Sequence, residues 1–174
     1  MKNFVMVCAV TAALFLSHQA HADRALVISK QQVNCLAQNI YFEAKNQSFA
    51  GKLAVGLVTL NRVQDSRYPD TVCGVVKQGD KVQSLRDPKV MVPVRNRCKF
   101  SWYCDGKADI ITEKEIYEEI RNIALKMMLY PIIDFTDGAT HYHADYVKPS
   151  WAKVFRKTVV IDNHLFYRWE SAGE

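Results

Sequence analysis

Four cysteines lie downstream of an N-terminal secretory signal, and this combination restricts the fold more than any other feature of the sequence. Of the five cysteines in the chain, only Cys8 lies within the signal. An even number of cysteines in an oxidising compartment predicts two disulfides, with three possible pairings. Cys98 and Cys104 are close enough in sequence to close a short loop, which would leave Cys35 to pair with Cys73. Spacing alone does not fix the connectivity, so the other two pairings stay open.

The signal itself occupies residues 1–22. It has a basic start, an apolar run over 4–16 and an A-x-A cleavage sequence at its end, which are the three parts of a secretory signal peptide. The apolar run is shorter than the roughly 20 residues that a membrane span needs. We therefore expect cleavage after residue 22, export to the periplasm or the medium, and no stable membrane association of residues 23–174.

Composition predicts an ordinary globular domain. The chain has 174 residues, of which 49% are apolar and 24% charged, enough for one domain with a hydrophobic core. Its net charge of +5 is not gathered into a run of like charges, which argues against a nucleic-acid-binding arm and leaves an anionic polymer as a possible substrate. No repeat, phosphate-binding glycine loop or G-x-S-x-G sequence is present. We expect a monomer with a single catalytic domain over 23–174.

Apolar spacing predicts three helices. The first runs over 29–45 and the second over 51–63, each with apolar residues at helical intervals. The third begins at a capping box formed by Thr112 and Glu115, and Pro131 ends it.

The other segments predict connections and strands. Residues 65–79 form a connection, and the polar segment 79–96, which contains two prolines, indicates a long loop or lid. The runs 139–146 and 158–169 have strand-like composition. Helices first and strands last favour an α+β fold over a parallel βαβ sheet.

Glu43 is the first candidate for chemistry. It lies at the C-terminal end of the first predicted helix, next to Tyr41 and Phe42. Apolar walls and the negative end of the helix dipole both disfavour its charged form, as a general acid that works near neutral pH requires. On pattern alone a solvated glutamate, paired with Lys45 or Lys52, is the more common situation.

The histidines suggest an alternative zinc site. His141 and His143 would face the same side of a strand, and with His164 and Asp145 they could hold zinc that activates water for amide hydrolysis. Histidines that hydrogen-bond a cleft wall or a saccharide are the more common explanation of so short a pattern. The cysteines do not support zinc, because no C-x-x-C pair is present.

Aromatic residues are concentrated in the second half of the chain. Most of these rings are expected to pack in the core or on strands, while some could stack on sugar faces. Trp102, inside the predicted disulfide loop, is the ring that we expect to be most exposed. Asn61 and Arg62, at the end of the second helix, either bind substrate or cap that helix and pair with acids.

Five blocks of this sequence, in the same order, resemble the SleB-type cell wall hydrolases. Ile40-Tyr41-Phe42-Glu43-Ala44-Lys45 is similar to the family's opening I-Y-x-E-A-R, with Lys45 in place of arginine. Lys99-Phe100-Ser101 is similar to its Q-F-S, with Lys99 in place of glutamine. The five blocks, which together span most of residues 35–169, are 35–45, 51–63, 68–76, 100–102 and 164–167.

The resemblance implies a peptidoglycan-cleaving enzyme with a helix-rich, lysozyme-like or lytic-transglycosylase-like catalytic domain and short C-terminal strands. It implies that Glu43 is the catalytic acid and that no metal or cofactor is needed. The partner would be the peptidoglycan glycan strand. With its four cysteines, the sequence resembles a Gram-negative or phage-borne branch of this family. The candidate substrate-binding residues are Tyr41, Asn61, Arg62, Phe100, Ser101, Trp102, Tyr142, His143 and His164.

Glycoside hydrolysis normally needs two carboxylates, and the nearest candidates for a second one are Asp70 and Asp105. With Glu43 alone, the simplest reaction is lytic transglycosylation between N-acetylmuramic acid and N-acetylglucosamine. Two alternatives remain: a zinc-dependent N-acetylmuramoyl-L-alanine amidase, and an envelope-binding domain without enzymatic activity.

Overall fold

The computed structural model describes residues 29–170, so the predicted signal peptide lies outside the described residues. The elements in chain order are α2 (Lys30–Ala44), α3 (Phe49–Gln64), α4 (Val72–Val76), β1 (Gly79–Gln83), β2 (Met91–Cys98), η2 (Ser101–Cys104), α5 (Lys114–Leu129), β3 (His141–Ala144), η3 (Ser150–Lys153), β4 (Arg156–Ile161) and β5 (His164–Arg168). In this part of the chain, no helix is both long and apolar enough to span a membrane.

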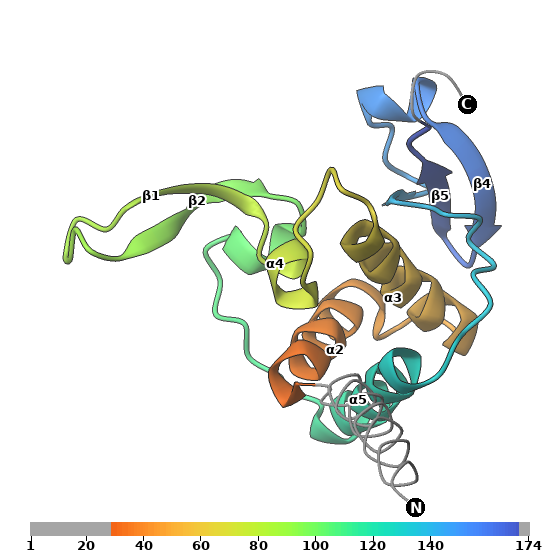
Figure 1. Cartoon of the computed structure of the whole chain (residues 1–174), viewed down its shortest axis with the longest axis horizontal. Helices are drawn as coiled ribbons and strands as arrows, with labels where there is room; N and C mark the ends of the chain where they lie inside the picture. Colours follow the sequence, from red (N-terminus) through yellow and green to blue (C-terminus); the bar gives the residue numbers. More distant parts are fainter. Residues whose placement is uncertain (1–28, 171–174) are drawn as a thin grey trace, which may run out of the picture.

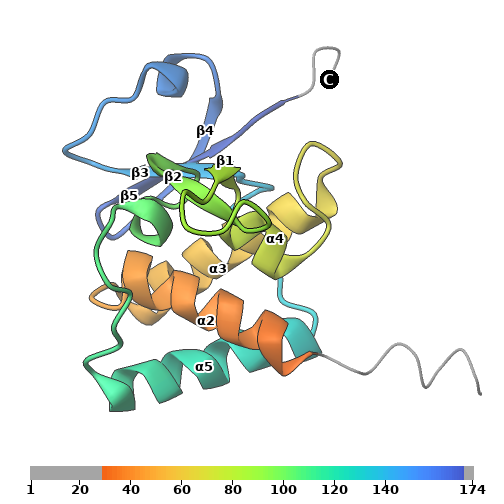
Figure 2. The same cartoon turned by 90° about the vertical axis from the view of Figure 1, so that its left-hand side faces the viewer.

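Helix α2 is the centre of the fold. It packs against α3, α4 and α5, and the sheet lies on the far side of α3 from α5 (Figure 2). Leu36, Ala37 and Ile40 of α2 are fully buried, which shows that α2 is surrounded by the other helices rather than lying on the surface. Ser29 caps the start of α2 by accepting a hydrogen bond from the backbone N–H of Gln31 at 3.2 Å.

The three predicted helices are confirmed as α2, α3 and α5, but the predicted capping box of α5 is wrong. The N-cap residue is Glu113, and no side chain caps the helix there. The Glu113 carboxylate instead accepts hydrogen bonds from Lys45 Nζ at 2.7 Å, from Thr112 Oγ1 at 2.6 Å and from the Tyr41 hydroxyl. Contacts with α2 have replaced the local cap.

The predicted loop over 79–96 is also wrong, because strands β1 and β2 form an antiparallel hairpin there. The hairpin extends away from the helices at the left of Figure 1. Its residues are mostly exposed on both faces, so the sequence lacks the apolar alternation that would have indicated strands.

The predicted C-terminal strands are confirmed as a three-stranded antiparallel sheet of order β3-β5-β4. One face of this sheet packs on α3, where Phe166 of β5 contacts Ala54 and Val58 in a second core cluster. Helices followed by an antiparallel sheet make the α+β fold that the sequence predicts.

Two disulfides are present, Cys35–Cys73 and Cys98–Cys104, which is the pairing favoured above among the three possible ones. The first ties α2 to α4. The second closes the segment that connects β2 to η2, and this segment borders the candidate site described next.

Candidate active site

Glu43 occupies the last turn of α2, where it faces the sheet. Its Oε2 accepts a hydrogen bond from the hydroxyl of Tyr142, on β3, at 3.0 Å. Burial raises the pKa of Glu43, and the Tyr142 hydrogen bond and the positive charge of Arg62 oppose this rise. The Tyr142 hydroxyl stays a donor, because its own burial and the nearby Glu43 carboxylate raise the pKa of Tyr142. Glu43 is therefore a carboxyl group that binds its proton unusually tightly, as a general acid requires.

Arg62, in the last turn of α3, is a cation whose positive charge acts on Glu43. Its Nε donates to the backbone oxygen of Thr140 at 2.7 Å, and its guanidinium lies over the rings of Phe100 and Tyr68, 4.9 and 5.5 Å from their centroids. The side chain is 5% exposed, and its buried Nη1 has no hydrogen-bond partner among the described residues. A buried guanidinium held in this way stabilises negative charge on Glu43.

Glu43 opens into a cavity of about 150 Å³, which we call the Glu43 cavity. A second cavity of about 740 Å³, the sheet-side cavity, continues from it toward the outer face of β3. Both are lined by Arg62, Lys99, Ser101 and Tyr142, so the two cavities form one cleft. The volume of the cleft is typical of sites that bind a ligand of several rings.

The walls of the sheet-side cavity are largely aromatic. The imidazole of His141 lies 4.6 Å from the Phe155 ring and 5.2 Å from the Trp151 ring, and His143 stacks on Tyr167 at 5.2 Å. Of these rings, those that line the cavity come from β3 and the segment around η3, and they are His141, His143, Trp151 and Phe155. They offer flat faces of the kind that bind pyranose rings.

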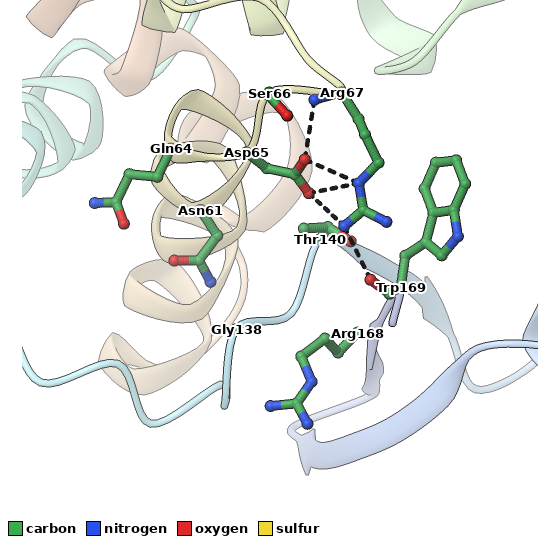
Figure 3. Close-up of a pocket in the computed structure, with 9 residues that line it drawn as sticks. All are labelled: Asn61, Gln64, Asp65, Ser66, Arg67, Gly138, Thr140, Arg168 and Trp169. Atoms are coloured by element: carbon green, nitrogen blue, oxygen red, sulfur yellow. Dashed lines mark hydrogen bonds and ion pairs between the residues drawn. The ribbon is translucent and has the colours of Figure 1, made fainter. Parts of the chain in front are cut away.

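A third cavity, of about 460 Å³, lies beside the end of α3 (Figure 3). Arg67 and Trp169 line both this cavity and the sheet-side cavity. Arg67 pairs with Asp65 at 2.6 Å, donates to the backbone oxygen of Trp169 at 2.9 Å, and lies over the Trp169 ring at 4.4 Å (Figure 3). This Arg67–Trp169 contact forms the wall between the two cavities.

The fold brings several predicted site residues together at the cleft. Glu43, Arg62, Phe100, Ser101 and Tyr142 line the Glu43 cavity. His143 lines the sheet-side cavity, where its Nε2 is 3.0 Å from the Tyr167 hydroxyl.

Other predicted site residues have structural contacts instead. Tyr41 is 1% exposed, and its hydroxyl bonds to Glu113 on the side of α2 that faces α5. Asn61 lines the third cavity, where its amide donates to Asp134 and to the backbone oxygen of Ala139.

Trp102 is not the exposed ring that the sequence suggested. It stacks on Phe42 at 4.6 Å, and its indole N–H donates to Asn39 Oδ1 at 3.0 Å. These contacts make it part of the core edge beneath the cleft, because α2 supplies both of its partners.

The proposed zinc ligands do not converge. In the register of the sheet, His141 pairs with Tyr167 and His143 with Leu165, whereas His164 pairs with Ala144. His141 and His143 therefore share one face of the sheet, while His164 lies on the other with Tyr142. Among the described residues, no group of three or more His, Cys, Asp or Glu side chains could hold a metal ion.

The candidates for a second carboxylate also lie elsewhere. Neither Asp70 nor Asp105 lines the two cavities of the cleft, and Glu43 is the one acidic residue among those that do. Tyr68 and Gln78 also line the sheet-side cavity, and no sequence pattern singled them out. The hydrogen bond between Tyr142 and Glu43 was not predicted either. Only the alternation of residues along β3, which turns Tyr142 away from His141 and His143, could have indicated that contact.

A helical layer that presents one desolvated glutamate to an aromatic cleft, covered by a small antiparallel sheet, defines a lysozyme-like α+β hydrolase fold. The chain belongs to the Cell Wall Hydrolase family, whose family model matches residues 46–167. The matched segment begins just after Glu43, so the assignment of Glu43 depends on the geometry of the site.

Curated relatives are spore cortex-lytic enzymes. The protein from Oceanobacillus iheyensis is 27% identical over 71 residues, which cover 41% of this chain and 26% of the relative. The protein from Bacillus subtilis is 35% identical over 48 residues, covering 28% of this chain and 16% of the relative. The matches thus span about a quarter or less of the length of these relatives.

Solved structures share the fold over most of the chain. The catalytic domain of the germination-specific lytic transglycosylase SleB from Bacillus anthracis aligns with a TM-score of 0.59 at 22% identity, covering 82% of this chain and 98% of that domain. The catalytic domain of the Bacillus cereus SleB protein aligns with a TM-score of 0.55 at 23% identity, covering 80% and 91%.

Proposed function

We propose that this chain cleaves the glycan backbone of peptidoglycan between N-acetylmuramic acid and N-acetylglucosamine, as a lytic transglycosylase with Glu43 as its one acid and base. The observation that carries the proposal is that, among residues 29–170, Glu43 is the one carboxylate that lines the cleft. Membership of the Cell Wall Hydrolase family and the fold shared with a lytic transglycosylase domain support it.

The reaction has two proton transfers. The Glu43 carboxyl donates its proton to the glycosidic oxygen, and the bond from that oxygen to C1 of the muramic acid breaks. The resulting Glu43 carboxylate, stabilised by Tyr142 and Arg62, then accepts the proton of the sugar's own 6-hydroxyl. The 6-oxygen bonds to C1 and closes a 1,6-anhydro ring, so no water is consumed and Glu43 regains its proton.

The products of digestion test this reaction. Mass spectrometry of soluble fragments from purified peptidoglycan should show ends of 1,6-anhydro-muramic acid. Free reducing muramic ends would mean hydrolysis and require a second carboxylate. Free stem peptides with intact glycan would mean amidase activity, and binding to sacculi without soluble products would mean a binding domain.

The variant Glu43→Gln keeps the size of the side chain but cannot donate the proton. We expect it to fold and to lose about 10²–10⁴-fold in rate, as removal of a general acid usually does. Full activity in this variant would exclude Glu43 as the acid.

We also propose that residues 1–22 are a cleaved signal peptide, because peptidoglycan lies outside the cytoplasm, and that residues 23–174 act as a monomeric catalytic domain. N-terminal sequencing of the exported protein should begin at Asp23, and light scattering should give the mass of one chain.

A further inference from the structure

The sheet-side cavity has an unbalanced charge. Among the described residues that line it, Arg62, Arg67 and Lys99 are cations and none is acidic. Arg67 is paired with Asp65. Lys99 forms no ion pair within the described part of the chain, and Arg62 Nη1 is buried without a hydrogen-bond partner there. Two cations of this cavity thus have no anionic partner in the cavity itself.

These two cations lie where the cavities meet. Arg62 and Lys99 line both the sheet-side cavity and the Glu43 cavity. An anionic group held between them would therefore sit next to the bond that Glu43 protonates. Arg62 is fixed by its hydrogen bond to Thr140 and by the rings of Phe100 and Tyr68, whereas Lys99 is exposed at the rim of the cleft.

His141 supports the view that positive charge is concentrated in this cavity. Its imidazole lines the cavity, and its pKa is lowered to about 4, first by burial and then by the positive charges of Arg62, Lys99 and Arg67. His141 is neutral at pH 7 and does not itself contribute a positive charge. It does show that the charges of all three cations reach the interior of the cavity.

The polymer that we propose as substrate carries a matching group. Muramic acid bears a lactyl group that continues into a stem peptide, and the peptide has free carboxylates. Aromatic faces such as those of Trp151 and Phe155 suit the sugar rings, while guanidinium and ammonium groups suit the carboxylates.

We propose that the sheet-side cavity binds a carboxylate of the acidic stem peptide on the muramic acid at the cleavage site, with Arg62 and Lys99 as its partners. This inference rests on the proposed function and adds to it a preference for anionic over neutral glycan. Lys99 is the specificity-determining residue of the pair, because it is exposed at the rim of the cleft, whereas Arg62 is buried and fixed in place.

Neutralising the substrate tests the inference. Peptidoglycan carboxylates can be amidated with methylamine and a carbodiimide, which leaves the glycan intact. The wild-type protein should cleave native material with a higher kcat/KM than amidated material. In Lys99→Gln, that native-to-amidated ratio should fall by about two- to fivefold, the range for one partly exposed ion pair. In Lys99→Glu it should fall further.

Lys114→Gln is the matched control. Lys114 is exposed at the start of α5, and this helix lies on the opposite side of the helical layer from the sheet (Figure 2). The variant Lys114→Gln removes the same charge from the protein as Lys99→Gln but should leave the native-to-amidated ratio of kcat/KM unchanged. An equal fall in both variants would show that overall charge, not the cavity, attracts the anionic wall, and would overturn the inference.

Failure of the carboxylate-binding inference can be told apart from failure of the proposed function. If the wild type cleaves native and amidated glycan equally well, the cavity does not bind carboxylates, and the proposed glycan cleavage stands. If the wild type cleaves neither, the proposed function is wrong. Sedimentation with native and amidated sacculi then still decides the inference: equal binding overturns it, and binding to native sacculi that weakens in Lys99→Gln but not in Lys114→Gln supports it.

Discussion

Tyr142 of β3 donates a hydrogen bond of 3.0 Å to Glu43 of α2, across 99 residues of sequence. This contact joins the sheet to the helical layer at the one acidic residue that the described part of the chain contributes to the cleft. In the proposed reaction, the Tyr142 hydroxyl would orient the Glu43 carboxyl group when that group is protonated and would stabilise it when it is charged.

The first prediction concerns the variant Tyr142→Phe. The hydrogen bond from Tyr142 lowers the pKa of Glu43, so its loss should raise that pKa and keep Glu43 protonated to higher pH. The alkaline limb of the pH profile of kcat/KM should move to higher pH. The rate at the optimum should fall by about 10- to 100-fold, because a hydrogen bond to a charged group contributes roughly 1.5–3 kcal/mol.

Tyr146→Phe is the control for this variant, because Tyr146 is 81% exposed just after β3. Its profile should superimpose on that of the wild type. If the profile of Tyr142→Phe also superimposes, the hydrogen bond does not act on the catalytic proton.

A second prediction concerns the stability of Glu43→Gln. Burial raises the folded-state pKa of Glu43 above its unfolded value, so the folded protein binds this proton more tightly than the unfolded chain. The resulting stability is complete below the unfolded pKa and is lost as pH rises through the folded pKa. At pH 7 to 8, Glu43→Gln should therefore be more stable than the wild type, by on the order of 1 kcal/mol.

Urea unfolding at pH 4 and at pH 8 checks whether Glu43→Gln is more stable than the wild type. The difference in the free energy of unfolding between the two proteins should be present at pH 8 and shrink toward pH 4. Glu118→Gln, on the exposed face of α5, should change stability by less than about 0.5 kcal/mol at either pH. A less stable Glu43→Gln at pH 8 would contradict the desolvation argument.

The parts of the fold that could be predicted from sequence are those in which one face of an element is buried. Helices α2, α3 and α5 have apolar residues at helical spacing, and the sequence showed them. Strands β1 and β2 have almost no buried residue, so their sequence carries no alternation. The start of α5 was misjudged because Lys45 and Tyr41 bind Glu113, and no local pattern contains this tertiary contact.

The site was predictable only in part. The position of Glu43 at a helix end is local, and the sequence indicated it. Its partners Tyr142 and Arg62 come from β3 and α3, and their distance to Glu43 depends on how the sheet packs on the helices. Tyr41, which was predicted to bind substrate, lies buried on the side of α2 that faces α5, and helical spacing alone does not indicate which side this is.

The third prediction separates the two disulfides. Cys35–Cys73 closes a long loop and Cys98–Cys104 a short one. Loop entropy predicts that replacing both cysteines by alanine costs about 4 kcal/mol for the first pair and about 2 kcal/mol for the second. Activity should show the opposite order, because the second disulfide holds the segment that carries Lys99 and Ser101 into the cleft.

Denaturant midpoints and kcat/KM at a temperature where both variants remain folded check this order. Full activity in a folded variant that lacks Cys98–Cys104 would show that this disulfide does not position the cleft segment.

A fourth prediction concerns the contact between Asn39 and Trp102. Asn39 is fully buried, donates to Thr59 Oγ1 at 3.0 Å and accepts from Trp102 Nε1 at 3.0 Å. Trp102→Phe keeps a ring against Phe42 but leaves the Asn39 oxygen without its donor. This should destabilise the protein by about 1–3 kcal/mol. A double-mutant cycle with Asn39→Leu checks this contact. The double variant should lose less free energy of unfolding than the two single variants lose in total.

The last prediction concerns acid stability and His141. The folded-state pKa of His141 is about 4, against 6.5 for a free imidazole, chiefly because of burial and then because of the nearby cations Arg62, Lys99 and Arg67. Between these two values the unfolded chain binds the proton and the folded protein does not. Stability should therefore fall as pH is lowered from about 6.5 to about 4.

The variant His141→Phe keeps an aromatic ring against Trp151 and Phe155 but cannot bind a proton. It should show a shallower fall in unfolding midpoint over this pH range than the wild type. Lys99→Gln removes one of the cations that lower the pKa of His141. The folded-state pKa of His141 should therefore be slightly higher in this variant, and the unfolding midpoint should fall slightly less over the same pH range. If the unfolding midpoints of the wild type and of His141→Phe depend on pH in the same way, the cavity does not lower the pKa of His141.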